Sequence, residues 1–171
     1  MPVVRDFRNY PYSQPRIERC GRYLGRSSYW KLYAIENILR VVIHSVLSVQ
    51  IGPAWWDSAV TPRTMRGVNE TRRRYATHPH HTAPGNHDIH YIYLSTLNNI
   101  IRANSNFFLP IIPEIDQWIV RIEGILIPRN LIGHMNFPHT ADRQRIDDLH
   151  REISALLLRL NQKNVAIQVP R

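Results

Sequence analysis

The chain has 171 residues, about the size of one domain and long enough to bury a continuous apolar core. It contains a single cysteine, Cys20, so one copy cannot form a disulfide framework or a cysteine-based zinc cluster. The net charge is +9, the pI is near 10.3, and all but two of the 22 cationic residues are arginine. Because arginine binds phosphate through a planar pair of donors and stacks on bases, we expect a nucleic-acid or nucleotide partner.

The N-terminal sequence mixes charged and apolar residues and lacks the apolar core of a signal peptide. The longest weakly polar stretch, residues 41–56, contains histidine, glutamine and proline and is too short to span a bilayer. We therefore expect a cytoplasmic protein with no membrane partner.

Residues 1–26 contain several prolines and six arginines, which predicts an extended or partly ordered basic arm ahead of one helical domain at 27–171. A first helix is expected to begin at Ser27 or Ser28 and to end before Gly52, because apolar residues recur at three- and four-residue intervals. The tryptophans that follow, Trp55 and Trp56, are expected to fold back onto the core.

Residues 57–86 are polar, basic and free of apolar periodicity, so we expect a long surface loop inserted after the first helix. Helical spacing resumes over 88–104, again over 113–126 with Pro113 in the first turn, and finally from Thr140 to 162. The absence of a convincing strand pattern predicts an all-α fold, a four- to five-helix up-and-down bundle.

An arginine and a histidine separated by four residues occur three times, at Arg73/His78, Arg129/His134 and Arg145/His150. Residues five apart on a helix are rotated by about 140°, so the last pair should diverge. The first pair lies in the expected loop. The Arg129/His134 pair lies where an apolar helix is expected to end, and it is therefore the candidate site.

The order of an apolar helix, Arg129-Asn130, three residues, His134 and then Asn136 resembles the signature of the HEPN superfamily of small α-helical bundles. The segments YAIENILRVVIHSVLSVQIGPAWW and YLSTLNNIIRANSNFF also resemble conserved blocks of one HEPN subgroup. That subgroup is also found attached to a eukaryotic mRNA quality-control endonuclease. The likeness covers the chain from about residue 29 to 160, but not the basic arm or the 57–86 insert.

This resemblance implies a metal-independent endoribonuclease that acts as a homodimer without a cofactor, in a toxin or defence setting where an antitoxin or regulatory protein is a possible partner. His134 can take the proton of a ribose 2′-OH or give one to the departing 5′-oxygen. Arg129 can neutralise charge on the phosphate oxygens, and Asn130 can orient either group. The alternative for the same residues is structural: Arg129 as a helix C-terminal cation and His134 as a boundary residue.

Glu36, Arg40 and His44 are spaced i, i+4 and i+8, which predicts one polar row on the first helix. This row either supports the site, by holding Arg129 or RNA, or is a surface ladder of ion pairs. Asn136 is a further candidate for site support.

The insert contains Arg72, Arg73 and Arg74 beside Tyr75, a composition suited to binding a phosphate backbone and stacking on a base. A solvated charge run is the simpler interpretation. The insert also carries three histidines, which are common zinc ligands, but these three lie around a proline on an expected loop, so we expect no metal site.

Three functions follow from the sequence. The first is the dimeric endoribonuclease, and the second is a catalytically silent HEPN module that binds RNA or a protein partner as a scaffold. The third is a metal-dependent phosphodiesterase that uses the histidine-rich insert.

Overall fold

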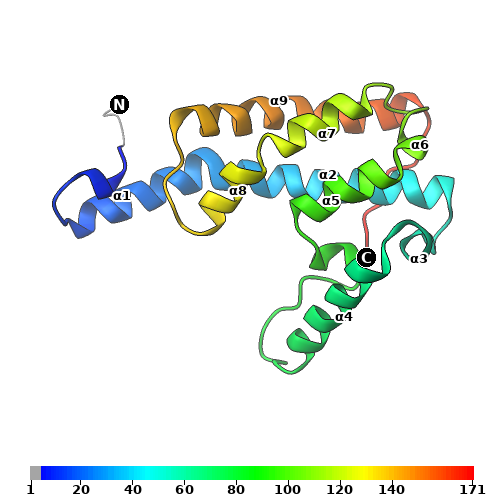
Figure 1. The fold of residues 1–171 in the computed structure, drawn as a ribbon, viewed down its shortest axis with the longest axis horizontal. Coiled ribbons are helices and arrows are strands. Elements are labelled where there is room, and N and C mark those ends of the chain that lie inside the picture. The colour runs from blue at the N-terminus through cyan, green and yellow to red at the C-terminus, as the bar shows by residue number, and fades with distance from the viewer. Residues whose placement is uncertain (1–4) are drawn as a thin grey trace.

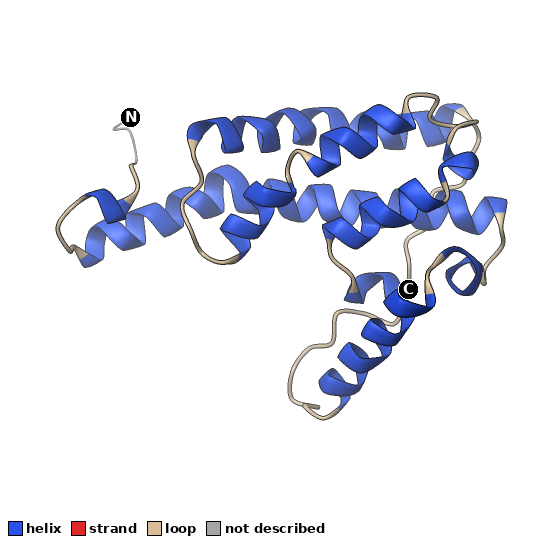
Figure 2. Cartoon of the chain, in the orientation of Figure 1, coloured by secondary structure: helices blue, strands red, loops and turns tan. Residues whose placement is uncertain are grey.

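The computed structural model describes residues 5–171, and over that range it is built of helices, turns and loops without a strand (Figure 2). The expected all-α class is therefore confirmed. The helices, in chain order, are η1 (Phe7–Asn9), α1 (Gln14–Leu24), η2 (Gly25–Tyr29), α2 (Trp30–Gln50), α3 (Trp55–Ala59), α4 (Pro62–Ala76), η3 (Asp88–Tyr91), α5 (Leu94–Ala103), α6 (Ser105–Phe108), α7 (Ile115–Glu123), α8 (Leu126–Gly133) and α9 (Thr140–Gln162).

Helix α2 is the centre of the core, and α5, α6 and α9 pack against it (Figure 1). Its fully buried residues recur every three or four positions, as in Ile35, Leu39, Ile43 and Leu47, so they form the apolar stripe that the sequence predicts. Each such side chain contributes about 1.5–3 kcal/mol on burial. The predicted return of the tryptophans onto the core is also confirmed, since Trp55 is 0% exposed and Trp56 7% exposed.

Helices α2 and α9 lie side by side and run in the same direction (Figure 1). Lys31 forms an ion pair of 2.6 Å with Asp147 in the N-terminal parts of the two helices, whereas Ser45, in the C-terminal part of α2, bonds the backbone of Gln168, which follows α9. Neighbours in a simple up-and-down bundle are antiparallel, so this pair departs from that order.

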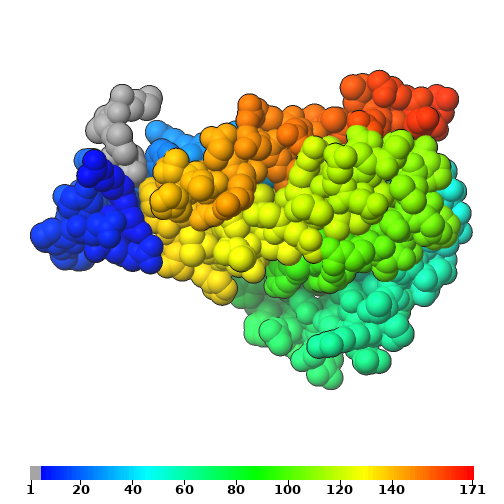
Figure 3. All heavy atoms as spheres, turned by 45° about the horizontal axis from the view of Figure 1, so that its top comes forward, coloured from blue at the N-terminus to red at the C-terminus, as the bar shows by residue number. Residues whose placement is uncertain are grey.

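The expected basic arm over residues 1–26 is wrong for its second half, which is helix α1. Pro15 occupies the first turn, where its missing N–H and fixed φ favour a helix. A wider π-helical turn, η2, joins α1 directly to α2, and α1 extends beyond the bundle (Figures 1 and 3). Residues 1–4, the start of the predicted arm, lie outside the described residues. Together α1, η2 and α2 form one continuous helix, Gln14–Gln50. It contains an apolar window of 18 residues that is long enough to cross a membrane, but half of that window is buried inside the fold.

The expected loop over residues 57–86 is also wrong, because α3 and α4 occupy much of it. Thr61 caps α4 by accepting a hydrogen bond from the Thr64 backbone at 3.3 Å, and Pro62 follows in the first turn. Val68 is the buried residue of α4, and the helix projects from the bundle (Figure 1). With so small an apolar face, α4 shows no periodicity for a sequence analysis to detect.

The helix predicted over 113–126 is shorter than expected. Helix α7 ends at Glu123, the chain turns at Gly124 and Ile125, and α8 begins at Leu126. This break matters for function, because it places the Arg129 segment on a separate short helix.

Candidate functional site

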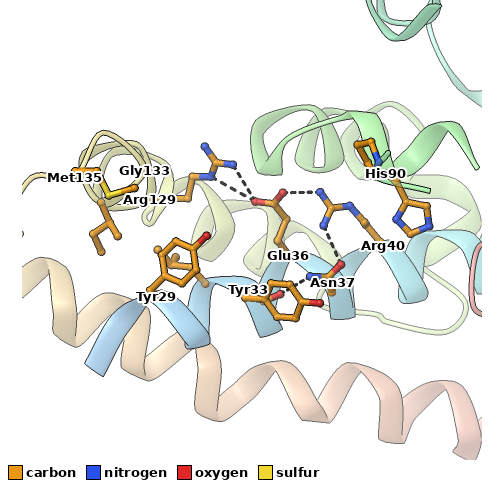
Figure 4. A pocket seen from close by; sticks show the side chains of 12 residues that line it. Tyr29, Tyr33, Glu36, Asn37, Arg40, His90, Arg129, Gly133 and Met135 are labelled. Carbon is orange, nitrogen blue, oxygen red and sulfur yellow. Dashed lines mark hydrogen bonds and ion pairs between the residues drawn. The ribbon is translucent and has the colours of Figure 1, made fainter. Parts of the chain in front are cut away.

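A hollow of about 460 Å³ opens beside α2 where α8 and η3 approach it (Figure 4). It is walled by Tyr29, Leu32, Tyr33, Glu36, Asn37, Arg40, Pro84, His90, Arg129, Ile132, Gly133 and Met135. The hollow thus joins residues that are almost 100 positions apart in the sequence, and it includes the predicted Glu36, Arg40 and Arg129.

The Glu36 carboxylate lies at the centre of the hollow, between two arginines (Figure 4). Arg40 Nη2 donates to Glu36 Oε1 at 2.6 Å, and Arg129 contacts Oε2 through Nη2 at 3.3 Å and Nε at 3.4 Å. The Glu36 side chain is 13% exposed, so its charge is largely removed from water. Glu36, Arg40 and Arg129 together therefore have a formal charge of one positive unit, and Arg129 is the more exposed of the two arginines.

Arg40 is the structural member of this trio. Besides Glu36, it donates to Asn37 Oδ1 at 3.1 Å and to the carbonyl oxygens of Ile89 at 3.2 Å and Ile92 at 2.9 Å. Its side chain is 10% exposed. These bonds attach α2 to the segment containing η3 and use four of the five Arg40 donors, which leaves Arg129 as the arginine of the hollow that is better able to bind a ligand.

The Arg129 side chain is 25% exposed, so part of its guanidinium is accessible to a ligand. Its guanidinium carbon lies 5.1 Å from the centre of the Tyr93 ring, and Nη1 approaches Asn130 Oδ1 at 3.4 Å. A Cβ added to Gly133 would lie 3.7 Å from Nη1, so this glycine leaves one side of the guanidinium uncovered.

His134 does not share the hollow with Arg129. The pair lies at a helix end, as expected, but Arg129 and Asn130 are inside α8 and His134 is the residue that caps it. Five positions along a helix correspond to about 140° of rotation. The exposed His134 side chain is consequently absent from the wall of the hollow in the described chain, where Gly133 and Met135 are present.

The backbone around His134 is fixed by the way α8 ends. Met135 has a φ of 58°, and its N–H donates to Ile132 while Asn136 N–H donates to Leu131 at 3.0 Å. This is the Schellman pattern, in which the left-handed position is normally glycine. The Asn136 side chain donates to the His134 carbonyl at 3.0 Å, so Asn136 supports the turn and not the hollow.

His44 does not line the hollow with Glu36 and Arg40, although it was predicted to form one polar row with them. It accepts a hydrogen bond from Trp55 Nε1 at 3.1 Å, and its ring lies 4.8 Å from that of His87. His87 in turn stacks on Trp55 at 5.5 Å. Burial lowers the pKa of His44, and burial followed by the proximity of His44 lowers the pKa of His87 to about 4. These histidines belong to an aromatic cluster beneath α3.

The predicted RNA-binding residues of α4 separate into two groups. Arg72 forms an ion pair of 2.8 Å with Asp88 and lies over the Tyr91 ring at 5.0 Å, while Tyr75 meets the same ring edge-on. Arg73 and Arg74 are exposed. Arg72 and Tyr75 therefore attach α4 to η3, and Arg73 and Arg74 remain on the surface.

The histidine-rich segment provides no metal-binding geometry within residues 5–171, where no three histidine, cysteine or carboxylate side chains are grouped as a metal site requires. His78 bonds the Arg74 carbonyl at 2.9 Å, and His90 bonds the Pro170 carbonyl at 3.0 Å. The metal-dependent phosphodiesterase gains no support from this arrangement.

Several residues of the site were missed from the sequence, and Tyr93 and His90 are two of them. Tyr93 immediately precedes α5 and is 64% exposed, and His90 lies in the wall of the hollow. A detectable signal existed for Tyr93 alone, because a large aromatic residue outside the apolar stripe of the next helix has no role in the core.

Comparison with family models, with curated proteins and with solved structures found no match in any of the three cases.

Proposed function

We propose that this protein is a HEPN-type, metal-independent endoribonuclease that cuts RNA at a site completed by two copies of the chain. The observation that carries the proposal is the arrangement of Arg129. It is tethered to Glu36, which Arg40 holds from the other side, and it keeps a quarter of its side chain exposed. A guanidinium that is positioned but not covered is suited to a phosphate oxygen.

The divergence of Arg129 and His134 within one chain favours a composite site. In a two-fold dimer the same patch faces itself, so His134 of each copy can reach toward the hollow of the other. The surface beside the hollow supports such pairing, because it exposes large apolar side chains: Tyr29 at 55%, Tyr33 at 68%, Ile127 at 78% and Met135 at 78%. Tyr29, Tyr33 and Met135 line the hollow itself, and exposed apolar side chains grouped in this way are typical of a protein interface.

The chemistry needs no metal when the nucleophile is the ribose 2′-OH. One His134 takes the 2′-OH proton as the oxygen attacks phosphorus, and the partner's His134 gives a proton to the departing 5′-oxygen. Arg129 stabilises the charge on the phosphate oxygens in the transition state. The P–O5′ bond breaks, and the products are a 2′,3′-cyclic phosphate and a 5′-hydroxyl.

The cellular setting that we propose is RNA restriction in the cytoplasm, in a toxin or defence system with an inhibitory partner. This part of the proposal depends on the HEPN resemblance alone.

The decisive experiment incubates the protein with mixed cellular RNA in EDTA and identifies the fragment ends. His134→Ala and Arg129→Ala are compared with His80→Ala, a matched control in the exposed 77–84 segment. We expect cyclic-phosphate and 5′-hydroxyl ends with the wild type and the control, and at least a hundredfold less cleavage with either site variant, about the loss of a general acid–base residue.

Equal cleavage by His134→Ala would contradict the proposal. Intact RNA in every tube, with wild-type binding retained, would instead identify the silent RNA-binding module.

A further inference from the structure

A second hollow, of about 530 Å³, lies between α4 and α5. One wall is a face of α4 containing Arg63, Thr64, Gly67 and Thr71, and the opposite wall includes Thr96 and Asn99 of α5. The sequence analysis assigned this region to a loop, so the groove is a feature of the structure alone.

The groove adjoins the Arg129 hollow, because two residues of its lining contact arginines of that hollow. Ile92 and Tyr93 line the groove, while the Ile92 carbonyl accepts from Arg40 at 2.9 Å and the Tyr93 ring lies 5.1 Å from the Arg129 guanidinium. Tyr93 is 64% exposed. A linear polymer bound at Arg129 therefore crosses one aromatic ring to enter the groove.

The lining of the groove suits a nucleic-acid strand. Hydroxyl and amide side chains provide donors and acceptors, and Arg63 places a cation at the edge. Helix α4 as a whole carries five arginines and one carboxylate, Glu70, so the electrostatic field on this side attracts a polyanion. Single-stranded nucleic acids bind where a basic groove adjoins exposed aromatic rings.

From these contacts we infer that the α4–α5 groove binds the single-stranded RNA that continues from the Arg129 site, with one base stacked on Tyr93 and the following nucleotide between the two helices. This inference rests on the proposed ribonuclease function and adds the path of the substrate. A polypeptide is the less favoured occupant, because the α4 field would select only acidic sequences.

Gly67 allows a specific test, since an added Cβ meets no atom within 4 Å and a longer side chain would enter the groove. Gly67→Glu places a carboxylate in the groove, and Asn69→Glu places the same additional charge about 200° around the helix. Residues 67 and 69 are both exposed, and both variants change the net charge equally. Any difference between them reports the groove and not the total charge.

Binding is measured by fluorescence anisotropy with a non-cleavable 2′-O-methyl RNA of about ten nucleotides, a length within the range of single-strand sites. We expect Gly67→Glu to bind about tenfold more weakly than Asn69→Glu, as the loss of one stacked base and its phosphate contact would produce. A 4-thiouridine version of the RNA should crosslink to Tyr93 and to residues 63–71, and Gly67→Glu should abolish the crosslinks to 63–71. Circular dichroism melts establish that both variants are folded.

Two outcomes would overturn the inference, and they differ. If the wild type cleaves RNA but both variants bind equally, or crosslinks fall outside the groove, then the groove assignment is wrong and the ribonuclease stands. If the wild type neither binds nor cleaves RNA, the proposed function fails and the groove assignment fails with it.

Discussion

Glu36 is shared by two arginines whose surroundings give them opposite roles. Arg40 is 10% exposed and bonds two backbone carbonyls in addition to Glu36, whereas Arg129 is 25% exposed and contacts Glu36 at longer distances. A buried, fully bonded cation mainly supports the fold, and a partly exposed one contributes little to stability.

We therefore predict that Arg40→Met lowers the free energy of unfolding by about 3 kcal/mol, since it leaves a buried carboxylate and two carbonyls with fewer partners. Arg129→Met should lower it by less than about 1 kcal/mol. Urea unfolding followed by circular dichroism measures both values. Equal destabilisation would mean that Arg129 is also a structural residue and that the trio is one buried ion-pair network.

Met135 provides a second prediction at this scale. Its φ of 58° is unfavourable for a residue with a side chain, and its exposure of 78% means that little packing is lost on truncation. Met135→Gly should raise the free energy of unfolding by up to about 1 kcal/mol. Asn164, with φ of 55°, ends α9 by the same pattern and is the control, because asparagine tolerates this conformation and Asn164→Gly should change stability little. A loss of stability in Met135→Gly would show that the methionine side chain has a packing role.

Among the elements, the aromatic cluster formed by α2, α3 and the residue before η3 makes stability depend on pH. His44 and His87 each use Nδ1 to accept a hydrogen bond, from Trp55 Nε1 and from the Ile89 backbone, both at 3.1 Å. Protonation would place a donor against a donor, and burial lowers the pKa of both rings.

As the pH falls from 6.5 toward 4, the unfolded chain binds a proton at His87 that the folded chain does not bind, because the folded pKa is about 4. The free energy of unfolding should decrease as the pH falls from 6.5 to about 4, and the contribution of His87 should not change further below pH 4. Urea midpoints across the window for the wild type and His87→Asn, which keeps an acceptor but does not titrate, isolate the effect. The same pH slope in both proteins would assign the acid sensitivity to other groups.

The sequence predicted those elements that present a broad apolar stripe. Helix α2, α5, α9 and the all-α class follow from spacing, and the return of the tryptophans follows from the cost of exposing them. The contact of Arg129 with Glu36 was one of two alternatives that the spacing of Glu36, Arg40 and His44 left open. Helices α1 and α4 were not found in this way, because each buries a single residue, Cys20 and Val68 respectively, and the local signal that they share is a proline in the first turn. The direction of the His134 side chain could not be read from the sequence, because it depends on where α8 begins and ends: Arg129 lies inside this helix and His134 caps it, so the two side chains diverge.

At the scale of the whole molecule, the exposed apolar surface beside the site predicts a dimer. Ile127→Glu, which places a charge on a side chain that is 78% exposed, should shift the protein to monomers and abolish RNA cleavage together. Leu158→Glu on α9, at a residue 57% exposed and outside the hollow, is the matched control. Sedimentation velocity measures the state of association. A monomeric Ile127→Glu protein that still cleaves RNA would contradict the composite site.

The parallel contact between α2 and α9 determines when the site can exist during synthesis. The two helices are joined by contacts such as Lys31 with Asp147, 116 positions apart, so the part of the apolar face of α2 that α9 covers stays unpaired until α9 has left the ribosome. Glu36 and Arg40 likewise meet Arg129 only after α8 has been synthesised. A nascent chain therefore carries no assembled site until both α8 and α9 have emerged, and the RNA cleavage that we propose would begin only after that point.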